Sequence, residues 1–192
     1  MHLRTKSIFM LVLVLSAAGC SDPKEPNEAN FRKAINAYYA THPVCTQDIM
    51  TNAKVGQPIT LAPGTYNASH LADLQAAGAI EIKEIPNPNN PNFPGKEPWH
   101  VATILDNGMW RNGWGFCYGS YSAEKVERWT EPAQIMGITA TQVDYHRKFA
   151  PAKWASEKFL KSQSKTKLED TASAPLILMN DGWQVPDGER LF

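Results

Sequence analysis

A run rich in proline interrupts the middle of this 192-residue chain. Residues 86–98 hold five of its fourteen prolines together with four asparagines. Proline lacks a backbone N–H and fixes φ, so such a run forms neither a continuous helix nor the interior of a sheet. Loops of this length are uncommon inside a compact domain unless they join domains or carry a function. The run therefore predicts a linker between two lobes, residues 30–85 and residues 99–192.

The first of these lobes has a helical pattern. Phe31, Ile35 and Tyr38 follow the spacing of one helical face, and Asn27 suits the N-cap, so we expect a helix over about 28–40. A second helix over about 69–77 is followed by residues 79–85, where apolar and charged side chains alternate as in a half-buried strand. The pattern predicts a small helical lobe.

The run L-x-x-L-x-x-A-G-x-I from Leu71 to Ile80 resembles the helix and first wing strand of winged-helix domains. A DNA-binding member of that family would carry a basic surface before the wing. Residues 66–80 instead contain Asp73 and no lysine or arginine, and the whole chain has a formal net charge of zero. This charge distribution argues against a nucleic-acid partner.

The second lobe has the pattern of an antiparallel sheet. We expect strands at about 100–105, 109–121, 138–149 and 176–179, and one helix over about 151–163, with Pro151 in its first turn. The predicted fold class is therefore α+β, with a small helical N-terminal lobe followed by an antiparallel β-rich lobe.

The N-terminus has the organisation of a secretory signal. Met1–Lys6 is basic, and Ile8–Leu15 is a continuous apolar run, which is too short to span a bilayer as a helix of about 20 residues. Residues 1–19 are therefore predicted to be a signal peptide. The remaining chain carries 17 basic and 19 acidic side chains, which makes it slightly acidic.

The segment Ala17-Ala18-Gly19-Cys20 resembles the lipobox of bacterial lipoproteins, in which small residues precede the cysteine that becomes the lipidated N-terminus. The resemblance implies cleavage before Cys20 and diacylglyceryl modification of that residue, with fatty acids such as palmitate. The polar residues that follow include Pro23 and Pro26, so residues 20–29 are predicted to be an extended, lipidated tether. Aspartate after the cysteine favours the inner membrane in Gram-negative members of the family, so Ser21 favours the periplasmic face of the outer membrane.

The other two cysteines are Cys45 and Cys117. An even number of cysteines in an oxidising compartment indicates a disulfide between them. Gly115 and Gly119 flank Cys117 on the same strand face and leave room for another backbone to approach. The alternative is a catalytic thiol, with either Cys117 paired to His146 or Cys45 paired to the nearby His42 as its base.

Aromatic side chains supply candidate ligand contacts. We expect Trp114, Phe116 and Tyr118 to share one strand face and pack in a core. Trp99 and Trp110 lie near turns and are the candidates for exposed rings that stack on glycan.

Asp144 and His146 stand two residues apart on a predicted strand, so a carboxylate could orient an imidazole, with His100 as a third polar group. No closely spaced set of His or Cys indicates a metal site, and no nucleotide-binding motif indicates a cofactor. We expect a non-catalytic binding or accessory role in the periplasm, with another envelope protein or peptidoglycan as partner. The alternatives are an envelope hydrolase using Cys117 or the Asp144/His146 pair, and a glycan-binding module.

Overall fold

The computed structural model describes residues 22–46, 53–64, 68–88, 99–111, 113–163 and 166–187. The predicted signal peptide, Cys20 and most of the proline-rich run lie outside these ranges. The elements within them are α1 (Glu28–Thr41), β1 (Val44–Cys45), β2 (Pro58–Leu61), α2 (Ala68–Ala76), β3 (Ile80–Ile85), β4 (Trp99–Ile104), β5 (Trp110–Arg111), β6 (Gly115–Trp129), β7 (Ala133–Ile135), β8 (Ile138–Pro151), α3 (Glu157–Ser162), β9 (Glu169–Met179) and β10 (Gly182–Gln184).

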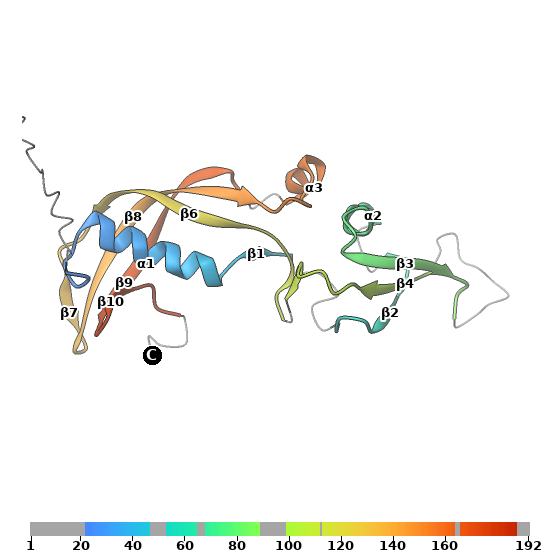
Figure 1. Cartoon of the computed structure of the whole chain (residues 1–192), viewed down its shortest axis with the longest axis horizontal. Coiled ribbons are helices and arrows are strands. Elements are labelled where there is room, and N and C mark those ends of the chain that lie inside the picture. The colour runs from blue at the N-terminus through green and yellow to red at the C-terminus, as the bar shows by residue number, and fades with distance from the viewer. Residues whose placement is uncertain are drawn as a thin grey trace, which may run out of the picture.

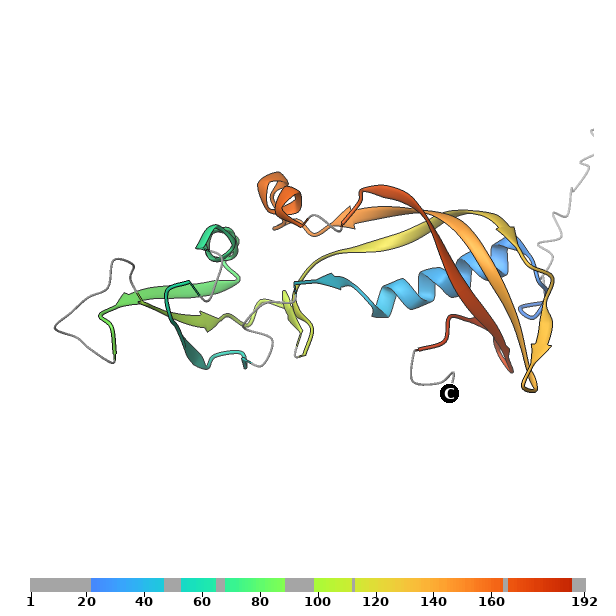
Figure 2. The same ribbon diagram turned by 180° about the vertical axis from the view of Figure 1, so that it is seen from behind.

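A large antiparallel sheet forms one lobe, with the strand order β1-β6-β8-β9-β10. β5 adds to β6, and β7 adds to β8 as a hairpin. The long strands β6 and β8 bend, so the sheet curls around α1 (Figures 1 and 2). The class is α+β and rich in strands, as the sequence predicts.

The core of the large lobe lies between α1 and the concave face of the sheet. Phe31 and Ile35 of α1, Val143 of β8 and Leu176 of β9 are fully buried there. Asn27 caps α1 as expected, because its side chain accepts a hydrogen bond of 2.9 Å from the Asn30 N–H. Burial of the apolar face of α1 therefore ties the start of the chain to its last strands.

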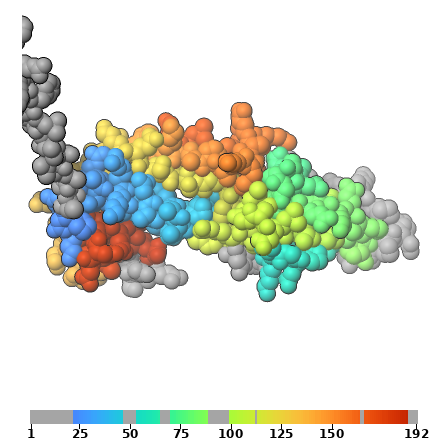
Figure 3. All heavy atoms as spheres, in the orientation of Figure 1, coloured from blue at the N-terminus to red at the C-terminus, as the bar shows by residue number. Residues whose placement is uncertain are grey.

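A second lobe contains β2, α2, β3 and β4. Its three strands are antiparallel in the order β2-β4-β3, and α2 packs on β3. The core includes Leu74 of α2, Ile80 of β3 and Ile104 of β4, together with Phe116 from the start of β6. The two lobes lie end to end (Figure 3).

The elements in each core are not those that the predicted division of the chain at residues 86–98 would group together. That division groups α1 with α2, whereas α1 packs on β6, β9 and β10. It also groups residues 99–104 with the large sheet, whereas β4 pairs with β2 and β3. The small lobe is thus an insertion between β1 and β6. The sequence division misses this because the pairing of strands in three dimensions, and not the position of a proline-rich run, decides which sheet a strand joins.

The segment before α1 folds onto the large lobe instead of extending from it. The Asn30 side-chain amide donates to the carbonyl oxygens of Asp22 (2.8 Å) and Glu25 (2.9 Å). The Trp183 indole N–H donates to the Lys24 carbonyl oxygen at 3.0 Å. Residues 22–27 therefore form a pinned turn, which differs from the extended tether expected over residues 20–29.

Candidate functional site

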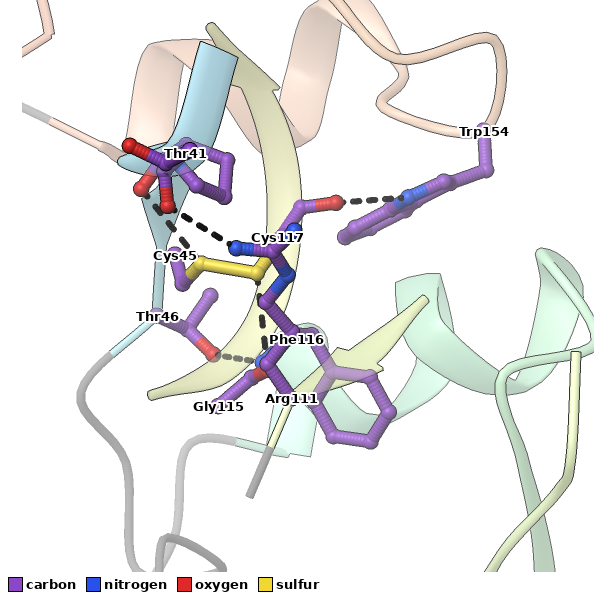
Figure 4. The surroundings of a disulfide bond; sticks show 9 residues. Thr41, Cys45, Thr46, Arg111, Gly115, Phe116, Cys117 and Trp154 are labelled. Atoms are coloured by element: carbon purple, nitrogen blue, oxygen red, sulfur yellow. Dashed lines mark hydrogen bonds between the residues drawn. A yellow bond between two sulfur atoms is a disulfide. The ribbon is translucent and has the colours of Figure 1, made fainter. Parts of the chain in front are cut away.

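The disulfide between Cys45 and Cys117 is present and confirms the predicted pair. The two cysteines are direct cross-strand partners of β1 and β6, with their Cα atoms 3.8 Å apart (Figure 4). Next to them, the Thr46 N–H donates to the Phe116 carbonyl oxygen at 2.9 Å, and the Thr46 hydroxyl accepts from the Phe116 N–H at 3.1 Å. The bond therefore joins the two points where the chain leaves the large lobe and returns to it, residues 45–46 and 115–117, which we call the neck of the inserted lobe. With both sulfurs in this bond, neither cysteine offers a free thiolate nucleophile.

The glycines beside Cys117 have the role expected of them. A Cβ on Gly115 would collide with the backbone oxygen of Thr46, and one on Gly119 would lie 2.6 Å from the Ala150 carbonyl oxygen. Gly115 also has a φ of +94°, a backbone conformation that residues with a side chain rarely adopt. These positions admit the neighbouring backbones because no side chain is present.

The Asp144 carboxylate binds other groups than His146. Its oxygens accept hydrogen bonds of 2.6 Å from the Arg128 Nε and 2.6 Å from the Ser173 hydroxyl. The Ser173 hydrogen bond and then that of Arg128 lower the pKa of Asp144. His146 shares its register with Lys125 and Thr171. The geometry matches a pair of strand-surface residues in separate interactions.

The aromatic residues around β6 differ from the expected arrangement in two respects. Phe116 and Tyr118 are buried, but Phe116 belongs to the small core and Tyr118 to the large one. Trp114 precedes β6 and is 41% exposed, so its assignment to the same core is wrong. Trp110 is half-buried and lies edge-to-face on Phe116, with ring centres 4.9 Å apart. Trp99 is half-buried at the start of β4.

A groove of about 350 Å³ lies between α1 on one side and β10 with the residues just before and after it on the other. Its lining residues include Lys33, Ala37, Tyr38, Thr41 and His42 of α1 and its C-cap, and Asp181, Trp183, Val185 and Asp187. The groove exists because α1 packs beside β10 across the curled sheet. This groove is the candidate functional site.

Tyr38 and His42 form the aromatic part of the groove. Their rings stack at 3.9 Å, one helical turn apart, and the Trp114 ring lies 5.6 Å from the His42 ring. His42 Nδ1 lies 2.9 Å from the Tyr38 carbonyl oxygen, so a proton there is donated to the end of the helix. His42 Nε2 then faces the Asp187 carboxylate at 3.4 Å.

Charged groups surround these rings. Burial raises the pKa of the Tyr38 hydroxyl, and the Asp187 carboxylate raises it further, so the hydroxyl stays a hydrogen-bond donor at neutral pH. Lys33 and Asp181 stand on opposite walls, one on α1 and the other beside β10. The groove can bind a ligand that has both an apolar or ring face and polar or charged groups.

Sequence reasoning does not find this groove. Tyr38 and His42 are separated from Asp181 and Asp187 by most of the chain, and no motif links them. The apolar period of α1 identifies the face that packs but not the strand beside its other edge. The only local feature that points to the groove is the four-residue spacing of Tyr38 and His42, which lets their rings stack one helical turn apart.

Three further observations bear on this part of the molecule. Within the described ranges, no three His, Cys, Asp or Glu side chains gather as metal ligands would. No helix in those ranges has the length and apolar character needed to cross a membrane. Comparisons of the chain with family models, curated proteins and solved structures find no match.

Proposed function

We propose that the protein is a lipid-anchored binding or accessory protein on the periplasmic face of the outer membrane, with a non-catalytic role. The support for the anchor is the basic and apolar N-terminal segment that ends in Ala17-Ala18-Gly19-Cys20. The Cys45–Cys117 disulfide agrees with an oxidising compartment. The bonded sulfurs and the engaged Asp144 give little support to the hydrolase alternatives.

The observation that carries the binding role is the groove between α1 and β10. Most small-ligand sites are concave, with aromatic walls and a few convergent polar groups, and this groove has both. Its mixed charge suits a segment of another envelope protein or the stem peptide of peptidoglycan. Both ligands combine apolar faces with amino and carboxylate groups.

A photoreactive residue placed in the groove tests this role. We expect Lys33 replaced by a photo-crosslinking amino acid to give one discrete product in intact cells, from protein or from peptidoglycan. The control is the same replacement at Lys158, which is exposed on α3. Equal crosslinking from both positions, or none from Lys33, would contradict the groove as the binding site.

The anchor needs its own test. The substitution Cys20→Ser removes the sulfur that would carry the diacylglyceryl group, and we expect the protein to leave the membrane fraction for the periplasmic extract. A Ser21→Asp variant, which keeps the cysteine, should remain bound to membrane but move toward the inner membrane. Unchanged fractionation of the Cys20→Ser protein would sink the proposed localisation.

Glycan binding is a second candidate function, and the exposure of Trp114 favours it. This ring is 41% exposed and lies beside His42 at the end of the groove, where it extends the aromatic surface. Trp99 and Trp110 stay candidates with half-buried rings. Peptidoglycan fragments should change the tryptophan fluorescence of the protein but not that of Trp114→Ala.

For the small lobe, we infer a weak winged-helix likeness without a nucleic-acid role. A helix followed by two antiparallel strands supports it, and the absence of lysine and arginine from residues 66–80 argues against a nucleic-acid ligand. Full-length protein that binds duplex DNA at physiological salt would overturn this inference.

A further inference from the structure

The turn between β7 and β8 carries an exposed apolar tip. Nine large hydrophobic side chains of the described residues are exposed, and three of them stand in this one turn. Ile135 is 59% exposed, Met136 is 99% exposed and Ile138 is 39% exposed. We call these three residues the apolar tip. Exposed apolar residues are ordinary when scattered, whereas a cluster of them marks a contact surface.

The backbone of the turn shows that the tip is held outward. Met136 has a φ of +50° and Gly137 a φ of +84°, as in a tight two-residue hairpin turn, and Ile135 pairs with Ile138. Asparagine or glycine usually occupies a position such as 136, because residues with other side chains rarely adopt a positive φ. A large apolar residue there serves neither the turn nor a core. Such a conflict between local conformation and residue type points to a functional constraint.

The apolar tip lies at the end of the molecule where the described chain begins. The start of α1 and the β7–β8 hairpin occupy the same end of the long axis, and the small lobe occupies the other (Figures 1 and 2). Lys24 is bonded to Trp183 of β10, and β10 pairs with β9 up to Met179, which is 38% exposed. Extending the β8–β9 register by two residues places Met179 beside Ile138.

The distance to the anchor follows from chain length. Because residues 22–27 are pinned to the large lobe, only Ser21 stands between Cys20 and the lobe, which makes two steps along the chain from Cys20 to Asp22. At about 3.6 Å per residue, the Cα of Cys20 lies no more than about 7 Å from that of Asp22. An acyl chain on Cys20 would therefore hold this end of the lobe against the bilayer.

We propose that the apolar tip inserts into the phospholipid leaflet beside the lipidated Cys20 and fixes the orientation of the protein on the membrane. This inference rests on the proposed lipid anchoring. Ile and Met side chains are suited to the boundary between headgroups and acyl chains. The anchored end then faces the membrane, and the small lobe points into the periplasm.

The charges near the tip favour insertion over electrostatic attraction. Asp22, Glu25, Glu131 and Asp181 are exposed at this end of the lobe, with Lys24 among them. An anionic membrane surface would repel such a group. The contact is therefore expected to depend on apolar burial and to weaken as the fraction of anionic lipid rises, with salt relieving part of that repulsion.

Fluorescence quenching from within the bilayer tests this proposal. In the acylated full chain with Cys45 and Cys117 bonded, Met136→Cys supplies the only free thiol for an environment-sensitive dye. In vesicles of phosphatidylethanolamine and phosphatidylglycerol, we expect a blue shift at this position and strong quenching by lipids labelled in the acyl chain. The control is Leu168→Cys, which is 61% exposed and stands about 35 Å away along β8.

The outcomes separate this inference from the anchor. A dye at position 136 that is as water-exposed as the dye at position 168 in acylated, vesicle-bound protein would overturn the inference and leave the anchor intact. Purification of a chain without acyl groups would overturn the anchor. The inference then stands only if that chain floats with vesicles and shows quenching at position 136. A dye at position 136 that is shielded equally without vesicles would instead mean contact with a second copy, which also overturns insertion.

A second variant removes the tip without harming the fold. The triple substitution Ile135→Ser, Met136→Asn, Ile138→Ser keeps a sequence that suits the turn. In the Cys20→Ser background, where no acyl chain contributes, we expect it to lower the vesicle partition constant at least tenfold. A partition constant equal to that of the parent would overturn the role of the tip.

Discussion

Arg147 is held by several interactions at once in the large lobe. Its guanidinium binds both carboxylate oxygens of Asp170, at 2.6 Å and 3.1 Å, and donates to the Tyr39 hydroxyl at 3.2 Å. It also lies over the Tyr121 ring, 4.0 Å from the centre. The Tyr39 hydroxyl in turn lies 2.7 Å from that of Tyr145. The group links α1 to three strands with its polar atoms paired, so removing one member leaves partly buried groups unsatisfied.

Asp170→Asn should therefore destabilise the protein by about 1–3 kcal/mol at neutral pH. The Arg147 hydrogen bond lowers the pKa of Asp170, so its contribution is complete above the unfolded pKa near 3.9 and is lost as the pH falls through the folded pKa. Urea unfolding at pH 7 and near pH 2 measures this, and the difference between variant and parent should shrink in acid. The matched control is Asp144→Asn, whose arginine partner is 82% exposed, and its effect should be smaller.

Backbone contact at the neck gives a second prediction at the scale of one residue. Gly115→Ala and Gly113→Ala both place a Cβ at positive φ, +94° and +76°, which costs about 1–2 kcal/mol. Only the Cβ at Gly115 meets the Thr46 carbonyl, since nothing lies within 4 Å of the one at Gly113. Gly115→Ala should therefore lower the free energy of unfolding by at least about 1 kcal/mol more than Gly113→Ala. Equal losses of unfolding free energy in the two variants would mean that the Thr46 backbone can move away from the added Cβ at little cost.

At the scale of elements, the sequence predicts what forms locally but not what packs together. The expected helix over 28–40 is α1, and the alternating run at 79–85 is β3, because each pattern lies within one element. The expected helix over 151–163 is shorter. Pro151 ends β8, pairing continues through the 2.8 Å bond from the Ala152 N–H to the Tyr118 oxygen, and α3 starts at Glu157. The groove combines a helix and a strand from opposite ends of the chain, which no local pattern encodes.

The disulfide stabilises the protein by joining β1 to β6. It joins residues separated by 72 positions, so in the chain-entropy model it stabilises the folded protein by about 4 kcal/mol. The double variant Cys45→Ala, Cys117→Ala should lose up to that amount in urea unfolding. Parent protein treated with a reductant should reach the same lower midpoint, whereas the variant should not respond to reductant. A reductant effect that persists in the variant would contradict this assignment.

At the scale of the whole molecule, the described residues form two cores, and one described side chain, Trp154, packs in both. Trp154 is half-buried, contacts both clusters, and donates from its indole N–H to the Cys117 carbonyl oxygen at 3.2 Å (Figure 4). Its ring lies 5.0 Å from that of Phe159, which in turn lies 5.0 Å from the His70 ring of α2. The cores should therefore unfold together in the parent protein, because the small core is held against α3 as well as through the neck.

Trp154→Ala should separate the unfolding of the two cores. We expect the small lobe to lose about 1–3 kcal/mol of protection, while the large lobe keeps nearly all of its own. Hydrogen exchange can measure this at two amides: that of Leu105, bonded to the Ala79 oxygen at 3.0 Å, and that of Phe149, bonded to the Leu168 oxygen at 2.7 Å.

The control for this prediction is Trp129→Ala. Trp129 is 41% exposed and packs edge-on against Phe31 of the large core, with ring centres 5.4 Å apart. Its removal weakens the large core while Trp154 still couples the two cores, so it should lower the protection of both amides alike. If Trp154→Ala lowered the protection of both amides equally, the lobes would be one cooperative unit. The small lobe could then not move independently of the large lobe, and a ligand on either lobe would stabilise both.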